Sequence, residues 1–263
     1  MSVSSVGKER LGPAEFRETS RIVGWALGAY TAVQIVGMVL AQNAIGATSI
    51  GALAAEFMAG KVGIAWSDPH AKEPSSRDIA VRAGRGALLG VVLSAAAFIA
   101  VFAHGGTTLR GHFGVAAFGV GVLAAGLAAV RDELLLRGFV LRAFRPVVPL
   151  PLVFVICGLC GAAAKLGDEA ATPFELVSSA ALAVAFAAAW VQDRGAWAAW
   201  GAHTAWLLAT TTLGRGALFD VKTAGGANLE NDPVVAAALV VLALSCAAFS
   251  VKSSRVLASP SSG

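Results

Sequence analysis

Charged residues are scarce in this sequence. Only 14% of the 263 residues are Asp, Glu, Lys or Arg, whereas 57% are hydrophobic, and the mean hydropathy is +0.73. A soluble globular domain carries about 25% charged residues. So few charges cannot cover a water-exposed surface of this size. The composition therefore excludes an ordinary soluble domain and favours lipid as the solvent.

Cysteine is scarce as well. The chain has three cysteines, all within apolar stretches, which excludes a disulfide framework. Cys157 and Cys160 form a CxxC pattern with no second CxxC, so we interpret them as small core residues. The first twenty residues are polar and contain no apolar core of a cleavable signal peptide. We therefore expect the first apolar stretch to remain in the protein as an anchor.

Long apolar runs, by contrast, are frequent. Eight stretches reach or approach the roughly 20 residues that a membrane-spanning helix needs, and none alternates with the period of two that a barrel strand would show. The sequence therefore predicts the all-α class: a polytopic membrane helix bundle with about eight transmembrane helices. We expect one transmembrane domain over 21–252, between tails at 1–20 and 253–263. The predicted spans are 21–41, 46–66, 83–103, 113–131, 147–165, 172–191, 196–213 and 233–251.

The basic residues are distributed unevenly between the two sides of the predicted bundle. If the loops alternate between sides, only four of the 20 Lys and Arg residues fall on the side opposite the N-terminus, namely Arg110, Lys165, Arg215 and Lys222. The positive-inside rule then places both termini in the cytoplasm. The compact loops favour a bacterial inner (cell) membrane. We expect membrane lipids as partners and no nucleic acid.

One charged run lies beside the end of the predicted fourth span: Arg131-Asp132-Glu133-Leu134-Leu135-Leu136-Arg137-Gly138. Charged residues in or beside a span are costly, so they are candidates for function. On a helix, Glu133 and Arg137 lie four residues apart on one face and can pair. Asp132 projects about 100° away and can face the interior of the bundle. These residues alone leave a second interpretation open, a charged helix end with a local salt bridge and outward-reaching arginines.

The run DELLLRG resembles the EExxxRG motif of the CPBP family, which comprises CAAX prenyl endopeptidases and bacteriocin-processing or immunity relatives. The family's third motif, a histidine two helices after the second motif, has a counterpart in His203, within the segment from Trp197 to Trp206. The resemblance covers about residues 113–213. It implies a membrane-embedded endopeptidase that hydrolyses peptide bonds of a membrane-anchored peptide or protein substrate. It also implies no cofactor and no metal. The catalytic residues that it implies are Asp132, Glu133, Arg137 and His203.

Three positions depart from the family pattern. Asp132 stands in place of a glutamate, Gly161 aligns with the histidine of the second motif, and Leu207 aligns with the closing Asn or Asp of the third. The missing imidazole and the missing polar donor favour an alternative: a non-catalytic scaffold or immunity protein of the same fold. His104 and His112 are expected on the outer side, where they could not replace the missing histidine.

A third alternative is a small proton-coupled transporter. It rests on Glu56, which lies inside the second predicted span, and on the Asp132 and Glu133 pair. Carboxylates within a membrane commonly serve as proton relays.

Overall fold

The computed structural model describes residues 13–41, 44–67, 73–106, 114–166, 171–213, 221, 223 and 229–258. These residues are overwhelmingly helical. They contain no strand, and one isolated bridge joins Ser67 to Gly195. The predicted all-α class is confirmed.

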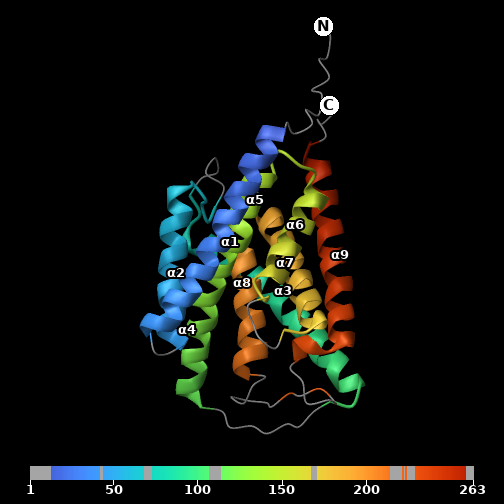
Figure 1. The fold of residues 1–263 in the computed structure, drawn as a ribbon. Coiled ribbons are helices and arrows are strands. Elements are labelled where there is room, and N and C mark those ends of the chain that lie inside the picture. Colours follow the sequence, from blue (N-terminus) through green and yellow to red (C-terminus); the bar gives the residue numbers. More distant parts are fainter. Residues whose placement is uncertain are drawn as a thin grey trace.

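Eight helical rods run alternately up and down the bundle in the described part of the chain (Figure 1). Two rods change from α- to π-helical geometry along their length. In chain order the elements are α1 (Pro13–Ala41), α2 (Ala44–Lys61), α3 (Ser76–Ala103), α4 (Val115–Asp132) with η1 (Glu133–Gly138) and α5 (Phe139–Phe144), α6 (Leu150–Ala163), α7 (Pro173–Asp193), α8 (Trp197–Leu207) with η2 (Leu208–Leu213), the short turn η3 (Leu229–Asn231), and α9 (Pro233–Ala258). Because the directions alternate, α1 begins and α9 ends at the same end of the bundle.

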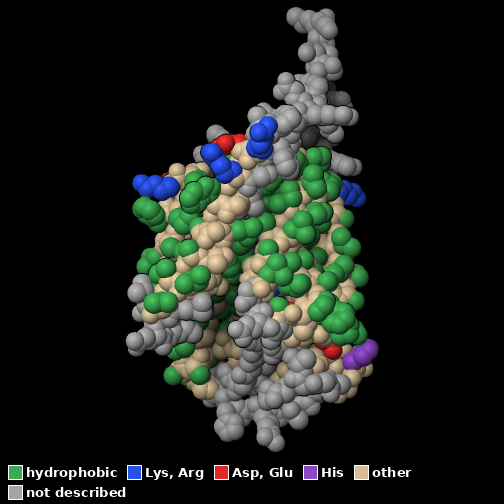
Figure 2. All heavy atoms as spheres, in the orientation of Figure 1, with side chains coloured by type: hydrophobic (Ala, Val, Ile, Leu, Met, Phe, Trp, Pro, Cys, Tyr) green, Lys and Arg blue, Asp and Glu red, His purple; other side chains and the backbone are tan. Residues whose placement is uncertain are grey.

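The outer surface of the bundle suits lipid. Among the residues that the structure describes, four helical segments are long and apolar enough to cross a membrane, and α6 is a shorter apolar helix; the four are Ser76–Ala103, Val115–Phe144, Pro173–Asp193 and Pro233–Ser254. Large apolar side chains such as Leu88, Ile99 and Leu244 are exposed on the flanks, as expected where the neighbour is hydrocarbon rather than water. Figure 2 shows hydrophobic side chains along the flank and Lys and Arg side chains near the end where α1 begins. The chain is therefore an integral membrane protein.

Glycines allow α3 and α8 to pack in direct backbone contact. A Cβ atom added to Gly86 would lie 1.8 Å from the backbone oxygen of Ala198, and one added to Gly90 would lie 2.2 Å from that of Ala202. Without a hydrophobic force between helices in lipid, close packing of small residues is a main source of their association. This contact presses α8 against α3 and so fixes the helix that carries His203.

The fourth rod is longer than its predicted span. The prediction ended this span at residue 131, and the structure continues the helix without a break to Phe144, so the charged motif lies within the helix. The physical reason is that the charges pair inside the bundle, Arg131 with Asp132 and Arg137 with Glu133. The first and last helices also extend beyond their predicted spans: α1 begins at Pro13 rather than at residue 21, and α9 ends at Ala258 rather than at residue 251.

Candidate active site

The charged motif occupies the π-helical turn η1 in the middle of the fourth rod. Here the backbone N–H of Phe139 donates to the carbonyl of Leu134, five residues back. Such π-bulges occur frequently at functional sites. The glycine that closes the motif is required by packing, because a Cβ at Gly138 would lie 3.0 Å from Ile64 and 3.2 Å from Trp190.

Glu133 is the centre of the site. Its side chain is 0% exposed, and its Oε1 atom accepts from Arg137 Nη1 at 2.7 Å and lies 2.9 Å from His203 Nδ1. A carboxylate that pairs with a guanidinium has only acceptors to offer, so the proton of this contact sits on Nδ1 of the imidazole. Glu133 therefore fixes the orientation of the His203 ring and leaves Nε2 free to face Asp132.

Asp132 lies on the other side of the imidazole. Its Oδ2 atom is 3.8 Å from His203 Nε2, which is too far for a direct hydrogen bond and close enough for one oxygen atom to contact both groups. The ring of His203 stacks on Phe186 with centroids 4.8 Å apart. The Arg137 guanidinium lies 5.2 Å from the centroid of the same ring. Phe186 thus holds two of the four predicted residues in place.

A second polar chain connects Asp132 to α1. Asp132 Oδ1 accepts from Arg131 Nε at 2.6 Å, and Arg131 Nη1 donates to Gln34 Oε1 at 2.6 Å. The Arg131 guanidinium also lies 5.1 Å from the centroid of the Tyr30 ring. The sequence analysis missed Gln34, Tyr30 and Phe186. Only Gln34, a polar residue within an apolar span, carried a signal that could have identified it.

The structure brings all four predicted site residues together. Asp132, Glu133, Arg137 and His203 come from α4, η1 and α8 and form one cluster of contacts. The cluster is nearly closed: the Asp132 side chain is 16% exposed. Among the described residues, Glu133 Oε2 and Arg137 Nε are buried with no hydrogen-bond partner. Unpaired buried polar atoms are costly and point to a functional role.

The structure gives Gly161 a packing role. This residue of α6 faces α7, where an added Cβ would lie 2.5 Å from Ala183 Cβ and 2.9 Å from the Ser179 carbonyl oxygen. A histidine does not fit at this crossing unless the two helices separate. Leu207 ends α8 one turn after His203 and offers no polar side chain.

The remaining candidates lie outside the cluster. Glu56 is exposed and accepts a hydrogen bond from Trp66 Nε1 at 2.6 Å. His104 is exposed at the end of α3, and His112 lies outside the described residues. Cys157 and Cys160 are buried free thiols, in agreement with their interpretation as core residues.

The described residues contain no group of three or more His, Cys, Asp or Glu side chains placed to hold a metal ion. That the site requires neither metal nor cofactor stays a prediction.

Comparison with known proteins gives one family. Residues 114–209 match the model of the family described as type II CAAX prenyl endopeptidase Rce1-like, and no curated protein matches the chain. The matched segment contains both the four clustered residues and the departures at Gly161 and Leu207. Residues 114–209 are therefore similar to the Rce1-like type II CAAX prenyl endopeptidase family, in agreement with the resemblance of the motifs around Glu133 and His203.

Proposed function

We propose that this protein is a CAAX-type intramembrane endopeptidase that hydrolyses peptide bonds of membrane-associated substrates. The observation that carries the proposal is the facing pair of Asp132 Oδ2 and His203 Nε2, 3.8 Å apart, with Glu133 bound to the opposite ring nitrogen. An oxygen atom beside this pair could contact both Asp132, a base, and protonated His203, a donor. The similarity of residues 114–209 to the Rce1-like type II CAAX prenyl endopeptidase family supports the same chemistry.

In this mechanism Asp132 acts as the general base. It takes a proton from water, and the resulting hydroxide attacks the carbonyl carbon of the scissile peptide bond. His203 in its protonated form donates from Nε2 to the oxyanion, while Glu133 stabilises the imidazolium through Nδ1. When the tetrahedral intermediate collapses, the C–N bond breaks and Asp132 returns its proton to the leaving amine. Arg137 holds Glu133 in place by donating to its Oε1 atom at 2.7 Å.

The test is cleavage of a membrane-anchored peptide by the purified full-length chain reconstituted in vesicles. We expect Asp132→Asn and His203→Ala each to lower the cleavage rate by about 10² to 10⁴, the usual contribution of a general acid or base. Glu56→Gln is the matched control, because it neutralises a carboxylate outside the cluster and is expected to leave the rate unchanged. Cleavage that persists in both site variants would disprove the assignment.

The second candidate is a non-catalytic relative of the same fold, a scaffold or immunity protein. Two observations favour it: Gly161 is part of a helix crossing and offers no imidazole, and Leu207 provides no polar donor. This candidate predicts no cleavage by the wild-type chain, together with a stable partner that co-purifies with it. The transporter alternative needs Glu56 together with the Asp132 and Glu133 pair, and Glu56 makes no contact with the cluster among the described interactions.

A further inference from the structure

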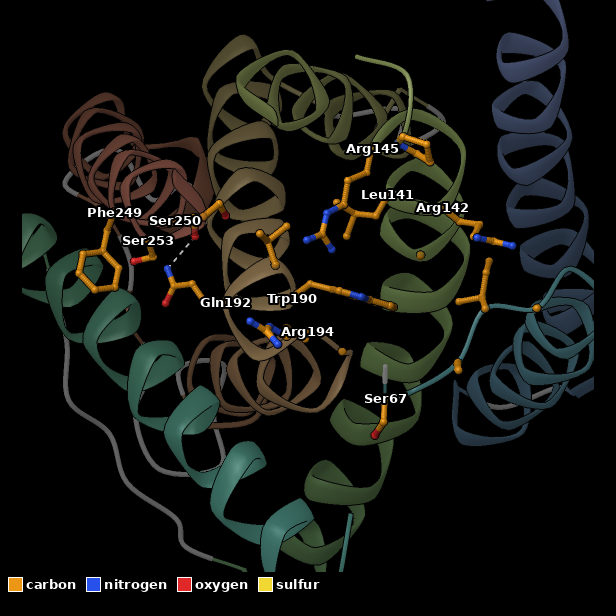
Figure 3. Close-up of a pocket in the computed structure, with 18 residues that line it drawn as sticks. Ser67, Leu141, Arg142, Arg145, Trp190, Gln192, Arg194, Phe249, Ser250 and Ser253 are labelled. Carbon is orange, nitrogen blue, oxygen red and sulfur yellow. Dashed lines mark hydrogen bonds between the residues drawn. The ribbon is translucent and has the colours of Figure 1, made fainter. Parts of the chain in front are cut away.

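A large cavity opens at the end of the bundle where α1 begins. Its volume is about 950 Å³, within the size range of small-molecule binding sites. Figure 3 shows it between the ends of α5, α7 and α9 and the segment that follows α2. Asp132, Glu133, Arg137 and His203 do not line it. The cavity is therefore separate from the candidate active site, although Gly138 of the motif forms part of its wall.

The described residues that line this cavity carry charge of one sign. Three of them are arginines and none is acidic; the arginines are Arg142, Arg145 and Arg194. Figure 3 shows the side chains of Arg145 and Arg194 directed toward the middle of the cavity and that of Arg142 directed away from it. Within the described part of the chain, no carboxylate pairs with Arg145 or Arg194. Guanidinium groups without a carboxylate partner attract an anion and match the geometry of phosphate oxygens.

The backbone sets the position of Arg194. This residue follows α7 with φ of 53°, a left-handed conformation that costs free energy for any residue other than glycine or asparagine. Neighbouring backbone bonds hold the turn: Gly195 N–H donates to the Trp190 carbonyl at 3.1 Å and Ala196 N–H to the Trp66 carbonyl at 2.9 Å. The turn thus presents a cation to the cavity at an energetic cost, and such costs accumulate at functional sites.

The rest of the cavity wall is partly apolar. Ile64, Leu141, Trp190 and Val191 line it beside several polar side chains, and Phe249 lies at its side on α9; the polar residues are Ser67, Gln192, Ser250, Ser253 and Ser254. Phe249 is 62% exposed, on a helix apolar enough to cross the membrane. A ligand in this position would therefore combine an anionic group between the arginines with an apolar part that leaves past Phe249 toward lipid.

We propose that this cavity binds a phosphate group, supplied by the headgroup of an anionic phospholipid. Basic cavities between membrane helices on the side rich in Lys and Arg suit such headgroups. The proposal rests on the cavity alone and is independent of peptidase activity.

The test measures lipid binding by the full-length chain in nanodiscs. One set contains phosphatidylcholine alone and the other contains phosphatidylcholine with phosphatidylglycerol, with native mass spectrometry of the released complex as the readout. The test variant is Arg145→Gln/Arg194→Gln. The matched control is Arg77→Gln/Lys252→Gln, which removes two exposed positive charges that do not line the cavity. Thermal unfolding of both variants in phosphatidylcholine should equal that of the wild type.

We expect the wild type to retain phosphatidylglycerol in preference to phosphatidylcholine. The test variant should bind phosphatidylglycerol about 10- to 30-fold more weakly, the effect of removing two basic residues near an anionic lipid, and the control should bind as the wild type does. In a third arm, inorganic phosphate replaces the anionic lipid. If the wild type binds inorganic phosphate and the test variant does not, while neither prefers phosphatidylglycerol, the phosphate site stands and its ligand is a soluble phosphate rather than a lipid. An equal preference for phosphatidylglycerol in the test variant and the wild type, or no binding in any arm, would overturn the proposal.

Discussion

At the scale of single residues, the site depends on one buried carboxylate. Glu133 accepts from Arg137 and contacts His203 with the same oxygen, so its charge balances two groups that cannot reach water. Breaking a buried ion pair by removing one partner usually costs more than the pair contributes, because the other charge stays buried and unpaired.

We therefore predict that Glu133→Gln, which preserves the shape of the side chain, destabilises the protein by about 3–5 kcal/mol. Thermal unfolding in detergent would show this as a clear fall in Tm. Glu56→Gln makes the same chemical change at an exposed position and is expected to leave Tm unchanged. Equal Tm values for the two variants would mean that Glu133 is not an essential charge partner of Arg137.

Arg131 is a positioning residue in this interpretation. It binds Oδ1 of Asp132 and Gln34 of α1 at the same time, and so leaves Oδ2 directed toward His203. We predict that Gln34→Ala, which removes one anchor of Arg131, lowers kcat of the reconstituted enzyme by about tenfold and leaves KM nearly unchanged. A 1 Å displacement of a reacting group can cost on the order of 10² in rate, and this variant loosens Asp132 only indirectly. Rescue by Gln34→Glu, which can still accept from Arg131, would separate positioning from a general loss of folding.

At the scale of helices, the crossing of α3 and α8 determines where His203 lies. Gly86 and Gly84 give a matched pair on the same helix, because a Cβ at Gly86 would lie 1.8 Å from a backbone oxygen and one at Gly84 meets nothing within 4 Å. We predict that Gly86→Ala destabilises the protein by roughly 1–3 kcal/mol through overpacking. Gly84→Ala should be neutral or stabilising by about 0.5–1 kcal/mol, since alanine is the better helix former. The comparison is made by thermal unfolding, and a larger loss for Gly84→Ala would contradict the packing seen here.

The crossing of α6 and α7 gives an equally direct prediction. Introducing the family's histidine by Gly161→His should lower Tm and should not raise the rate of peptide cleavage, because the added side chain meets Ala183 and Ser179 of α7 and forces the helices apart. Gly161→Ala should lower Tm in the same direction but less. A gain of cleavage activity in Gly161→His would show that α6 can shift and that the position belongs to the active site.

The helices themselves could be predicted from the sequence, whereas the side-chain contacts between them could be predicted only in part. Apolar length is a local property, so the eight rods follow from it. The end of the fourth rod could not be located this way, since the run from Arg131 to Arg137 has the composition of a helix end. Only the three-dimensional pairing shows why the helix continues. The contact of Glu133 with His203 was expected from motif order, but Gln34 lies 97 positions from Arg131, and no local pattern links two such residues.

At the scale of the whole molecule, the alternating helix directions and the uneven distribution of Lys and Arg together predict which end of the bundle faces the cytoplasm. The two ends of α3 test it on a single helix. Ser76 and His104 are both exposed, and the 28 residues of α3 separate them by about 42 Å at 1.5 Å per residue, enough to reach both sides of a bilayer. The end near Ser76 is expected to face the cytoplasm, because Lys and Arg are concentrated in the loops on that side.

We predict that a membrane-impermeant maleimide added to intact cells labels His104→Cys and does not label Ser76→Cys until the membrane is permeabilised. Both variants are made in a Cys246→Ala background, because Cys246 is only partly buried whereas Cys157 and Cys160 are buried. The reverse labelling pattern would mean that the basic cavity of Arg145 and Arg194 faces the outside of the cell. Peptide substrates would then have to be sought on that face, since α8 starts at the same end of the bundle as this cavity and His203 lies only two turns into that helix.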